Sequence, residues 1–97
     1  MRVIARKTLK DYWDKAPETE QELKSWFAEA VDADWATPAD VKAKYGNASI
    51  LKDGRVVFNI CGNKHRLVAW INFGFHTIYI RFVGTHKEYD QIDAQTI

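Results

Sequence analysis

The sequence has few of the residues that build disulfide-linked, metal-bound or membrane-spanning proteins. Its single cysteine, Cys61, cannot form an internal disulfide, and no two Cys or His positions have the spacing of zinc ligands. The apolar run near the N-terminus, Val3–Ala5, is too short for a signal peptide and far shorter than the roughly 20 residues that span a bilayer. We therefore expect a cytoplasmic protein without a metal, a cofactor or membrane contact.

Linkers and internal repeats are also missing. The 97 residues include two prolines and five glycines, which are not gathered in a Gly/Pro/Ser-rich tract, and no segment repeats another. Hydrophobic residues make up 46% of the chain and charged residues 28%, which is typical of a globular protein rather than a disordered one. We expect residues 1–97 to form a single domain.

Acidic side chains are absent from one long stretch of the chain. Between Asp53 and Glu88 there is no Asp or Glu, whereas the same stretch holds five Lys or Arg and all three histidines. Because the net charge is only +1, this stretch predicts a local site for a phosphate backbone rather than a bulk polyelectrolyte binder. The same cations are also compatible with a sheet surface that only contacts water. They are Arg55, Lys64, His65, Arg66, His76, Arg81, His86 and Lys87.

The first half of the chain has the spacing of one short strand and of helices. Residues 3–5 predict the strand, and apolar residues at helical spacing predict a helix over residues 8–16 that begins at a capping box of Thr8 and Asp11.

A second capping box, Thr19 with Glu22, predicts the start of an amphipathic helix, and a third helix is predicted from Pro38 to a left-handed cap at Gly46. The apolar stripe of the second helix should face a sheet. This stripe consists of Leu23, Trp26, Phe27, Ala30 and Val31.

From Ser49 onward the hydrophobic period changes from 3.6 to 2, which indicates antiparallel strands joined by hairpins. The order of strand, helices and further strands predicts an α+β fold in which the N-terminal helices pack on one face of an antiparallel sheet. The predicted strands cover residues 50–52, 55–61, 65–73 and 77–83, with turns at Asp53-Gly54, Gly62-Asn63 and around Gly74.

Even-length turns would place Asn59 opposite Arg66 and Trp70 opposite Arg81, so that one sheet face is apolar and can be covered by the helices. The opposite face would mix aromatic residues with arginines and hold no acid. This mixture suits an anionic ligand with flat groups, although the same residue types also anchor protein interfaces. The predicted outer face holds Arg55, Val57, Asn59, Arg66, Val68, Trp70, Asn72, Tyr79, Arg81 and Val83.

A terminal helix is predicted after the last strand, because Thr85 and Glu88 form a third capping box. His86 and Lys87 would then lie in the first turn, where the helix dipole favours anions over cations. Two cations at this position suggest a negatively charged ligand, whereas the simpler interpretation is that a surface histidine and lysine are tolerated at small cost.

Phosphodiester cleavage by an RNA 2′-hydroxyl requires a base, an acid and cations that stabilise the dianionic phosphorane. The ordinary pKa of a histidine, about 6.5, suits either proton transfer. If these residues converge at one end of the outer face, they could perform this reaction without a metal ion, with Tyr89 or Lys87 supplying the second proton-transfer group. The converging residues would be Arg66, Arg81, His86, Lys87 and Tyr89.

Two stretches of the second half, VFNICGNKHRL at residues 57–67 and YIRFVGTHKEYD at residues 79–90, resemble the HigB toxins. These form a branch of the RelE/ParE superfamily of type II toxin-antitoxin systems. The resemblance implies a RelE/ParE-like fold and a ribosome-dependent mRNA interferase. It also implies neutralisation by a HigA-type antitoxin with a helix-turn-helix domain, through which the complex would contact operator DNA. Gyrase poisons in the same superfamily use this scaffold without nuclease activity.

The resemblance also implies which residues form the site, because Asn63, Arg66, Arg81, Thr85, His86 and Tyr89 match motif positions. The predicted catalytic residues are Arg66, Arg81, His86 and Tyr89. The predicted RNA-binding residues are Asn63, Lys64, Trp70, Tyr79, Thr85 and Lys87. The alternative function is a non-catalytic module that binds RNA, a ribosome or a protein through the cationic face.

Overall fold

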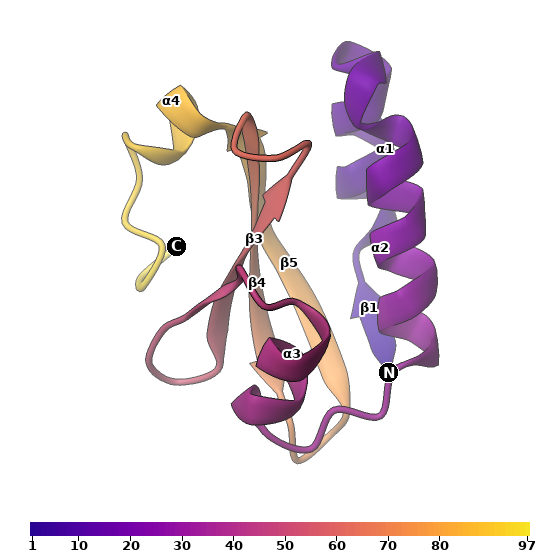
Figure 1. The fold of residues 1–97 in the computed structure, drawn as a ribbon, viewed down its shortest axis with the longest axis vertical. Coiled ribbons are helices and arrows are strands. Elements are labelled where there is room, and N and C mark those ends of the chain that lie inside the picture. Colours follow the sequence, from indigo (N-terminus) through magenta and orange to yellow (C-terminus); the bar gives the residue numbers. More distant parts are fainter.

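In the computed structural model, which describes residues 1–97, helices α1 and α2 lie on one face of a five-stranded sheet (Figure 1). None of the helices is long and apolar enough to cross a bilayer. The elements in chain order are β1 (Arg2–Ile4), α1 (Arg6–Lys15), the 3-10 turn η1 (Pro17–Thr19), α2 (Glu20–Asp32), α3 (Pro38–Lys44), β2 (Ser49–Ile50), β3 (Arg55–Ile60), β4 (His65–Asn72), β5 (Thr77–Thr85) and α4 (His86–Tyr89).

The strand order is β1-β5-β4-β3-β2. β1 runs parallel to β5, and the other neighbouring strands are antiparallel. The predicted α+β fold is therefore confirmed, as are the short first strand and the order of helices and strands.

The main core lies between the two helices and the inner face of the sheet. Trp26 of α2 is 2% exposed and packs edge-on against Phe58 of β3, with ring centroids 5.3 Å apart. The predicted stripe of α2 is narrower than expected, because Phe27 is only half-buried and Val31 is 47% exposed. The helical side chains buried in this core are Leu9, Tyr12, Trp13, Leu23, Trp26, Ala30 and Val41.

Two of the predicted helix starts are wrong in detail. α1 begins at Arg6, so Thr8 lies inside its first turn and Asp11 pairs with Lys7 at 2.7 Å instead of closing a capping box. Thr19 is the last residue of η1 and the N-cap of α2, as predicted, but it forms no capping box, because its hydroxyl donates to the carbonyl oxygen of Ala16 at 2.7 Å. In both places the chain already turns as a helix before the predicted cap.

The end of α3 also differs from the prediction. The helix ends at Lys44 with Tyr45 as its C-cap, and Gly46 does not have a positive φ, so the predicted left-handed glycine cap is wrong. Its start is capped by Thr37 and Asp40, whose side chains bond each other's backbone N–H groups.

Of the predicted hairpin turns, the one at Asp53-Gly54 forms at the expected residues, and the one between β3 and β4 begins one residue early. Asp53 and Gly54 both have positive φ, and a Cβ on Gly54 would lie 2.4 Å from the carbonyl oxygen of Ile71, so this turn requires glycine. At the β3–β4 turn the positive φ values belong to Cys61 and Gly62, one residue earlier than predicted.

The register between β3 and β4 places Asn59 opposite Arg66, as predicted. Between β4 and β5 the prediction is wrong, because Trp70 lies opposite Tyr79 and the register shifts between Val68 and Ala69. Arg81 is the extra residue of this bulge.

Because of the bulge, the two residues that follow it lie on the sheet faces opposite to those predicted from a regular alternation. Because one inserted residue reverses the alternation, Phe82 packs with Val57 and Val68 on the outer face, and Val83 packs toward the main core. The predicted outward position of Val83 is therefore wrong.

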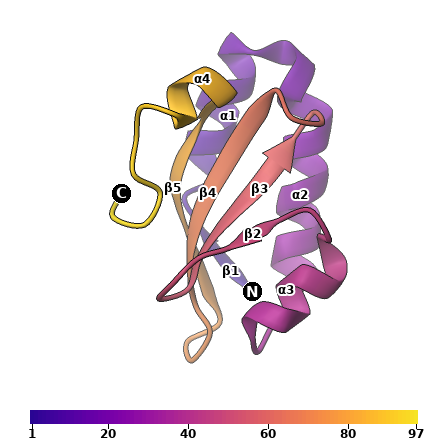
Figure 2. The ribbon, with the colours of Figure 1, turned by 60° about the vertical axis from the view of Figure 1, so that its left-hand side comes forward.

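The outer face is not open along its whole length. Residues 90–97 lie across it on the side opposite α1 and α2 (Figures 1 and 2). Val57, Val68 and Ala94 form a second buried cluster beneath this segment, so the two valines that were predicted to face a ligand are covered. Leu51, Phe82, Tyr89, Ile92 and Ile97 pack around this cluster.

Candidate active site

The start of α4 directly continues β5 and is fixed by the predicted capping box. Thr85 N–H donates to Glu88 Oε1 at 2.8 Å, and Glu88 N–H donates to the Thr85 hydroxyl at 3.1 Å. Hydrogen bonds from the backbone N–H and the side chain of Thr85 lower the pKa of Glu88. The charged carboxylate thus holds the first turn of α4, and with it His86 and Lys87.

His86 is tied to the β3–β4 turn and to a carboxylate. Its backbone N–H donates to the carbonyl oxygen of Lys64 at 2.9 Å. Its Nδ1 lies 3.1 Å from Asp90 Oδ2, which orients the ring and leaves Nε2 without a partner in the chain. The imidazole is 43% exposed, so Nε2 is accessible for a proton transfer.

Asp90 contacts His86 in the candidate site and was not among the predicted site residues. Its four-residue spacing from His86 was a usable signal, because residues four apart are neighbours on a helix. An aspartate at this spacing can fix the orientation of the imidazole.

Arg66 lies beside this pair and completes a cluster at one end of the outer face. Its guanidinium carbon is 5.6 Å from the centroid of the Tyr89 ring, and Nη1 donates to the carbonyl oxygen of Asn63 at 3.2 Å. No carboxylate side chain forms a salt bridge with Arg66, so its charge remains available to an anion. The structure thus brings Asn63, Lys64, Arg66, Thr85, His86 and Tyr89 to one corner.

Arg81 stands apart from this corner. It lies at the bulge, where its Nε donates to the carbonyl oxygen of Ile97 at 3.3 Å, and Arg55 donates to the same oxygen. Arg81 therefore faces the same side of the sheet as Arg66 and is free of carboxylate side chains, but the C-terminal segment engages it.

Trp70 and Tyr79 lie toward the other end of the outer face. Their rings stack with centroids 5.0 Å apart and an interplanar angle of 22°, and Trp70 Nε1 donates to the carbonyl oxygen of Asp53 at 2.9 Å. Trp70 lies four positions after Arg66 in β4, roughly 13 Å along the strand. The predicted aromatic contacts are thus separate from the α4 corner.

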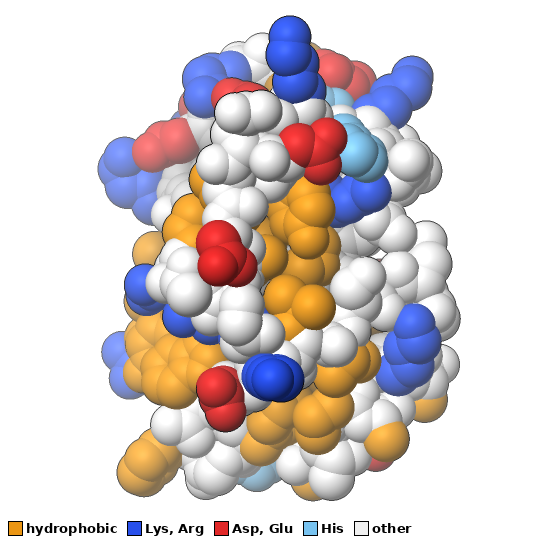
Figure 3. Space-filling view, turned by 90° about the vertical axis from the view of Figure 1, so that its left-hand side faces the viewer, with side chains coloured by type: hydrophobic (Ala, Val, Ile, Leu, Met, Phe, Trp, Pro, Cys, Tyr) orange, Lys and Arg blue, Asp and Glu red, His pale blue; other side chains and the backbone are white.

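The outer face as a whole has a mixed character. Figure 3 looks onto it and shows a strip of hydrophobic side chains with both Lys or Arg and acidic side chains around it, so the face is not free of acids as predicted. A histidine lies beside an acidic side chain near the α4 end. A phosphate would be attracted to the rim of this strip rather than to its centre.

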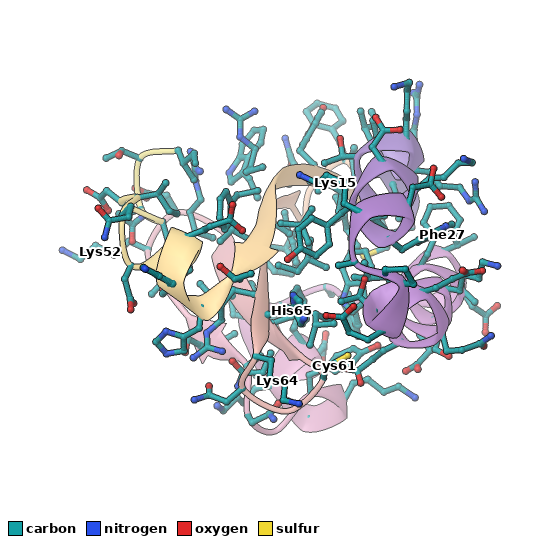
Figure 4. The ribbon with its side chains drawn as sticks, turned by 90° about the horizontal axis from the view of Figure 1, so that it is seen from above. Lys15, Phe27, Lys52, Cys61, Lys64 and His65 are labelled. Atoms are coloured by element: carbon teal, nitrogen blue, oxygen red, sulfur yellow. The ribbon has the colours of Figure 1, made fainter.

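A buried histidine supports the corner from the inner side. His65 is 4% exposed, with Nδ1 2.7 Å from the Tyr12 hydroxyl and Nε2 3.3 Å from Glu18 Oε2. Figure 4 looks down on this end and shows His65 between the sheet and the helical layer, with Lys64 in the adjoining turn. Burial, followed by the charges of Glu88 and Glu18, raises the pKa of Tyr12 to about 12, so its hydroxyl stays a neutral donor.

Comparison with known proteins decides the family. Residues 19–92 match the family model of HigB toxins, described as the RelE-like toxic component of a toxin-antitoxin system. The chain belongs to the HigB toxin family.

Curated HigB relatives align over nearly the whole chain. The mRNA interferase toxin HigB of Escherichia coli K12 is 37% identical over 96 residues, covering 97% of this chain and 92% of the relative. The mRNA interferase HigB of Shigella flexneri has the same identity and coverage. The mRNA interferase HigB of Escherichia coli O6:H1 is 24% identical over 94 residues, covering 95% of this chain and 91% of the relative.

Membership of the HigB family implies an antitoxin partner, because the family is defined as one component of a toxin-antitoxin system. The matched residues include the whole corner from Asn63 to Asp90. Ile97, which binds Arg55 and Arg81, lies outside the match.

Proposed function

We propose that the chain is a cytoplasmic, ribosome-dependent mRNA interferase that cleaves mRNA without a metal ion, and that residues 1–97 act as one domain. The observation that carries the proposal is the His86–Asp90 pair on the same short helix as Tyr89, over whose ring lies the guanidinium of Arg66, which has no carboxylate partner. The names of the HigB relatives support the same activity. The proposed partners are mRNA, the ribosome and a HigA-type antitoxin, through which the complex would reach operator DNA.

The proposed reaction is an in-line displacement at phosphorus. The 2′-oxygen attacks the phosphorus and loses its proton to a base, while the bond to the 5′-oxygen breaks and that oxygen receives a proton from an acid. The products are a 2′,3′-cyclic phosphate and a 5′-hydroxyl, so atoms and protons balance without a co-reactant.

His86 is suited to one of the two proton transfers. The carboxylate of Asp90 accepts from Nδ1–H at 3.1 Å, which leaves Nε2 as the reacting nitrogen and stabilises the imidazolium when it forms. Tyr89 or Lys87 would perform the other transfer.

Arg66 would stabilise the charge that develops on the phosphorane. Its stacking on Tyr89 and its bond to Asn63 hold the guanidinium in place before the substrate arrives, so little reorganisation is needed. Lys64, Thr85 and Lys87 would bind neighbouring phosphates. Trp70, Tyr79 and Arg81 would contact the RNA farther along the outer face.

The test is ribosome-dependent cleavage of a defined mRNA, mapped by primer extension, with His86→Ala, Asp90→Asn and Arg66→Ala. We expect His86→Ala and Arg66→Ala each to lose about 100-fold or more in rate, which is typical for a proton-transfer group or a charge-stabilising donor. The cleavage rate of Asp90→Asn should lie between those of His86→Ala and the wild type.

His76→Ala is the matched control, because His76 also lies near a carboxylate, 3.5 Å from Asp34, but belongs to the β4–β5 hairpin. This variant should cleave at the wild-type rate. Wild-type cleavage by His86→Ala and Arg66→Ala would remove both residues from the mechanism. RNA or ribosome binding without any cleavage by the wild type would favour the non-catalytic alternative.

A further inference from the structure

The sheet has an unpaired edge on the side away from β5. β2 pairs with β3 only at Ser49 and Ile50, which lie opposite Val57 and Val56, whereas β3 continues to Ile60. The chain that arrives from α3 therefore meets only part of β3 (Figure 2). The last residues of β3 have no neighbouring strand on this side.

The main-chain groups of Asn59 point to this empty edge. Arg55 bonds through both its N–H and its carbonyl oxygen to the β2 side, at Lys52 and Leu51, so alternate residues 55, 57 and 59 direct their main-chain groups the same way. The main-chain N–H and carbonyl of Asn59 make no backbone hydrogen bond on this side, although its side-chain amide donates to the carbonyl oxygen of the nearby Asn47 at 3.0 Å. An exposed sheet edge of this kind is a template for an added strand.

A groove of about 240 Å³ lies between this edge and α2. Its volume is that of roughly eight liquid water molecules, so it is larger than a single bridging water requires. Its lining includes Glu22 and Glu29 but no Lys, Arg or His. The indole N–H of Trp26, which also lines the groove, is the one buried side-chain donor in the protein without a hydrogen-bond partner.

The two carboxylates of the groove differ in how far they are neutralised. Glu29 Oε2 accepts from the Tyr45 hydroxyl at 2.9 Å and lies 3.2 Å from Lys44 Nζ. Glu22 accepts only the backbone N–H of Cys61, at 2.8 Å, so its charge and its other lone pairs are available. A cation fits this groove, whereas RNA phosphates would be repelled.

We propose that an extended segment of the antitoxin adds beside Asn59 as a further strand and places a lysine or arginine side chain in this groove against Glu22. The main-chain groups of Asn59 would pair with the backbone of the added segment. The existence of an antitoxin follows from the family and does not depend on the cleavage mechanism.

The test measures the affinity of the full chain for the antitoxin that is encoded with it. Glu22→Gln removes the charge but keeps an oxygen that accepts from Cys61 N–H, and it is expected to weaken binding by about tenfold. The matched control is Glu20→Gln on the same helix, because Glu20 is already paired with Lys24 and does not line the groove. This control should bind as the wild type does.

A second measurement follows amide hydrogen exchange in the wild-type complex, so that the test does not depend on how the variant folds. The Asn59 amide should exchange at least tenfold more slowly in the complex, whereas the Val57 amide, already paired with β2, should change little. Equal affinities of the two variants, or an Asn59 amide unchanged in the complex, would overturn the proposal. So would protection of Asn59 by an RNA oligonucleotide. Neither measurement requires cleavage, so a failure of this proposal about antitoxin binding is distinguishable from a failure of the proposed nuclease activity.

Discussion

Replacing Tyr12 with phenylalanine is expected to lower the free energy of unfolding by about 1–3 kcal/mol, because it leaves a buried ring nitrogen without its partner. The Tyr12 hydroxyl lies 2.7 Å from Nδ1 of His65, and both residues are nearly inaccessible to solvent. For a domain of this size, each kcal/mol corresponds to a shift of about 4–8 °C in the melting temperature.

Urea unfolding of the wild type, Tyr12→Phe and Tyr79→Phe measures this difference. Tyr79→Phe is the control, because its hydroxyl makes no hydrogen bond within the chain and its ring stacking with Trp70 is retained. We expect the control to lie within about 0.5 kcal/mol of the wild type. Equal stabilities of the two variants would show that the buried hydrogen bond contributes nothing.

The same substitution should change how stability depends on alkaline pH. The pKa of Tyr12 is raised to about 12 in the folded chain, above its ordinary value near 10. Its protonated form is thus favoured by folding, and this contribution is complete below pH 10 and is lost as the pH rises toward 12. The stability difference between the wild type and Tyr12→Phe should therefore narrow between pH 10 and 12. A constant difference across that range would contradict the assignment.

Two further predictions concern the core and the RNA interface. Trp26→Ala should lower the free energy of unfolding, measured with urea, by about 3–5 kcal/mol, because it empties a fully buried site against Phe58. Val31→Ala, on the exposed side of α2, should lower it by less than about 0.5 kcal/mol. Similar losses for the two variants would mean that α2 packs differently. Raising the salt concentration from 50 to 200 mM should weaken the binding of single-stranded RNA, because phosphate contacts release counterions. The slope of log affinity against log salt concentration should be shallower for Arg66→Ala. An affinity that does not depend on salt would argue against a phosphate site.

The sequence predicted several features that local signals decide, although the capping boxes at Thr8 and Thr19 and the glycine cap at Gly46 do not form. The Thr85–Glu88 box and the Asp53–Gly54 turn depend on residues close together in the chain, and both form as expected. The pairing of Asn59 with Arg66 also follows from a short turn, whose length fixes the register. The corner formed by Arg66, His86 and Tyr89 could be anticipated for the same reason.

The bulge and the covered outer face could not be predicted in this way. β5 carries apolar residues at Ile80, Phe82 and Val83, so its hydrophobic pattern is equally compatible with either parity beyond Arg81. The burial of Val57 and Val68 depends on contacts with Ala94, far away in the chain, and residues 90–97 have no regular period that would show which surface they cover. The Trp70–Arg81 pairing and the outward position of Val83 failed for these reasons.

The bulge at Arg81 makes β5 a strand shared by two separate interiors. Before the bulge, Ile78 and Ile80 pack in the main core under the helices. After it, Val83 packs against this main core, whereas Phe82 packs against the second cluster under the C-terminal segment. If Arg81 instead took a regular place in the ladder opposite Val68, Phe82 and Val83 would each move to the other interior. The single extra residue in β5 therefore decides which of the two interiors Phe82 and Val83 each fill.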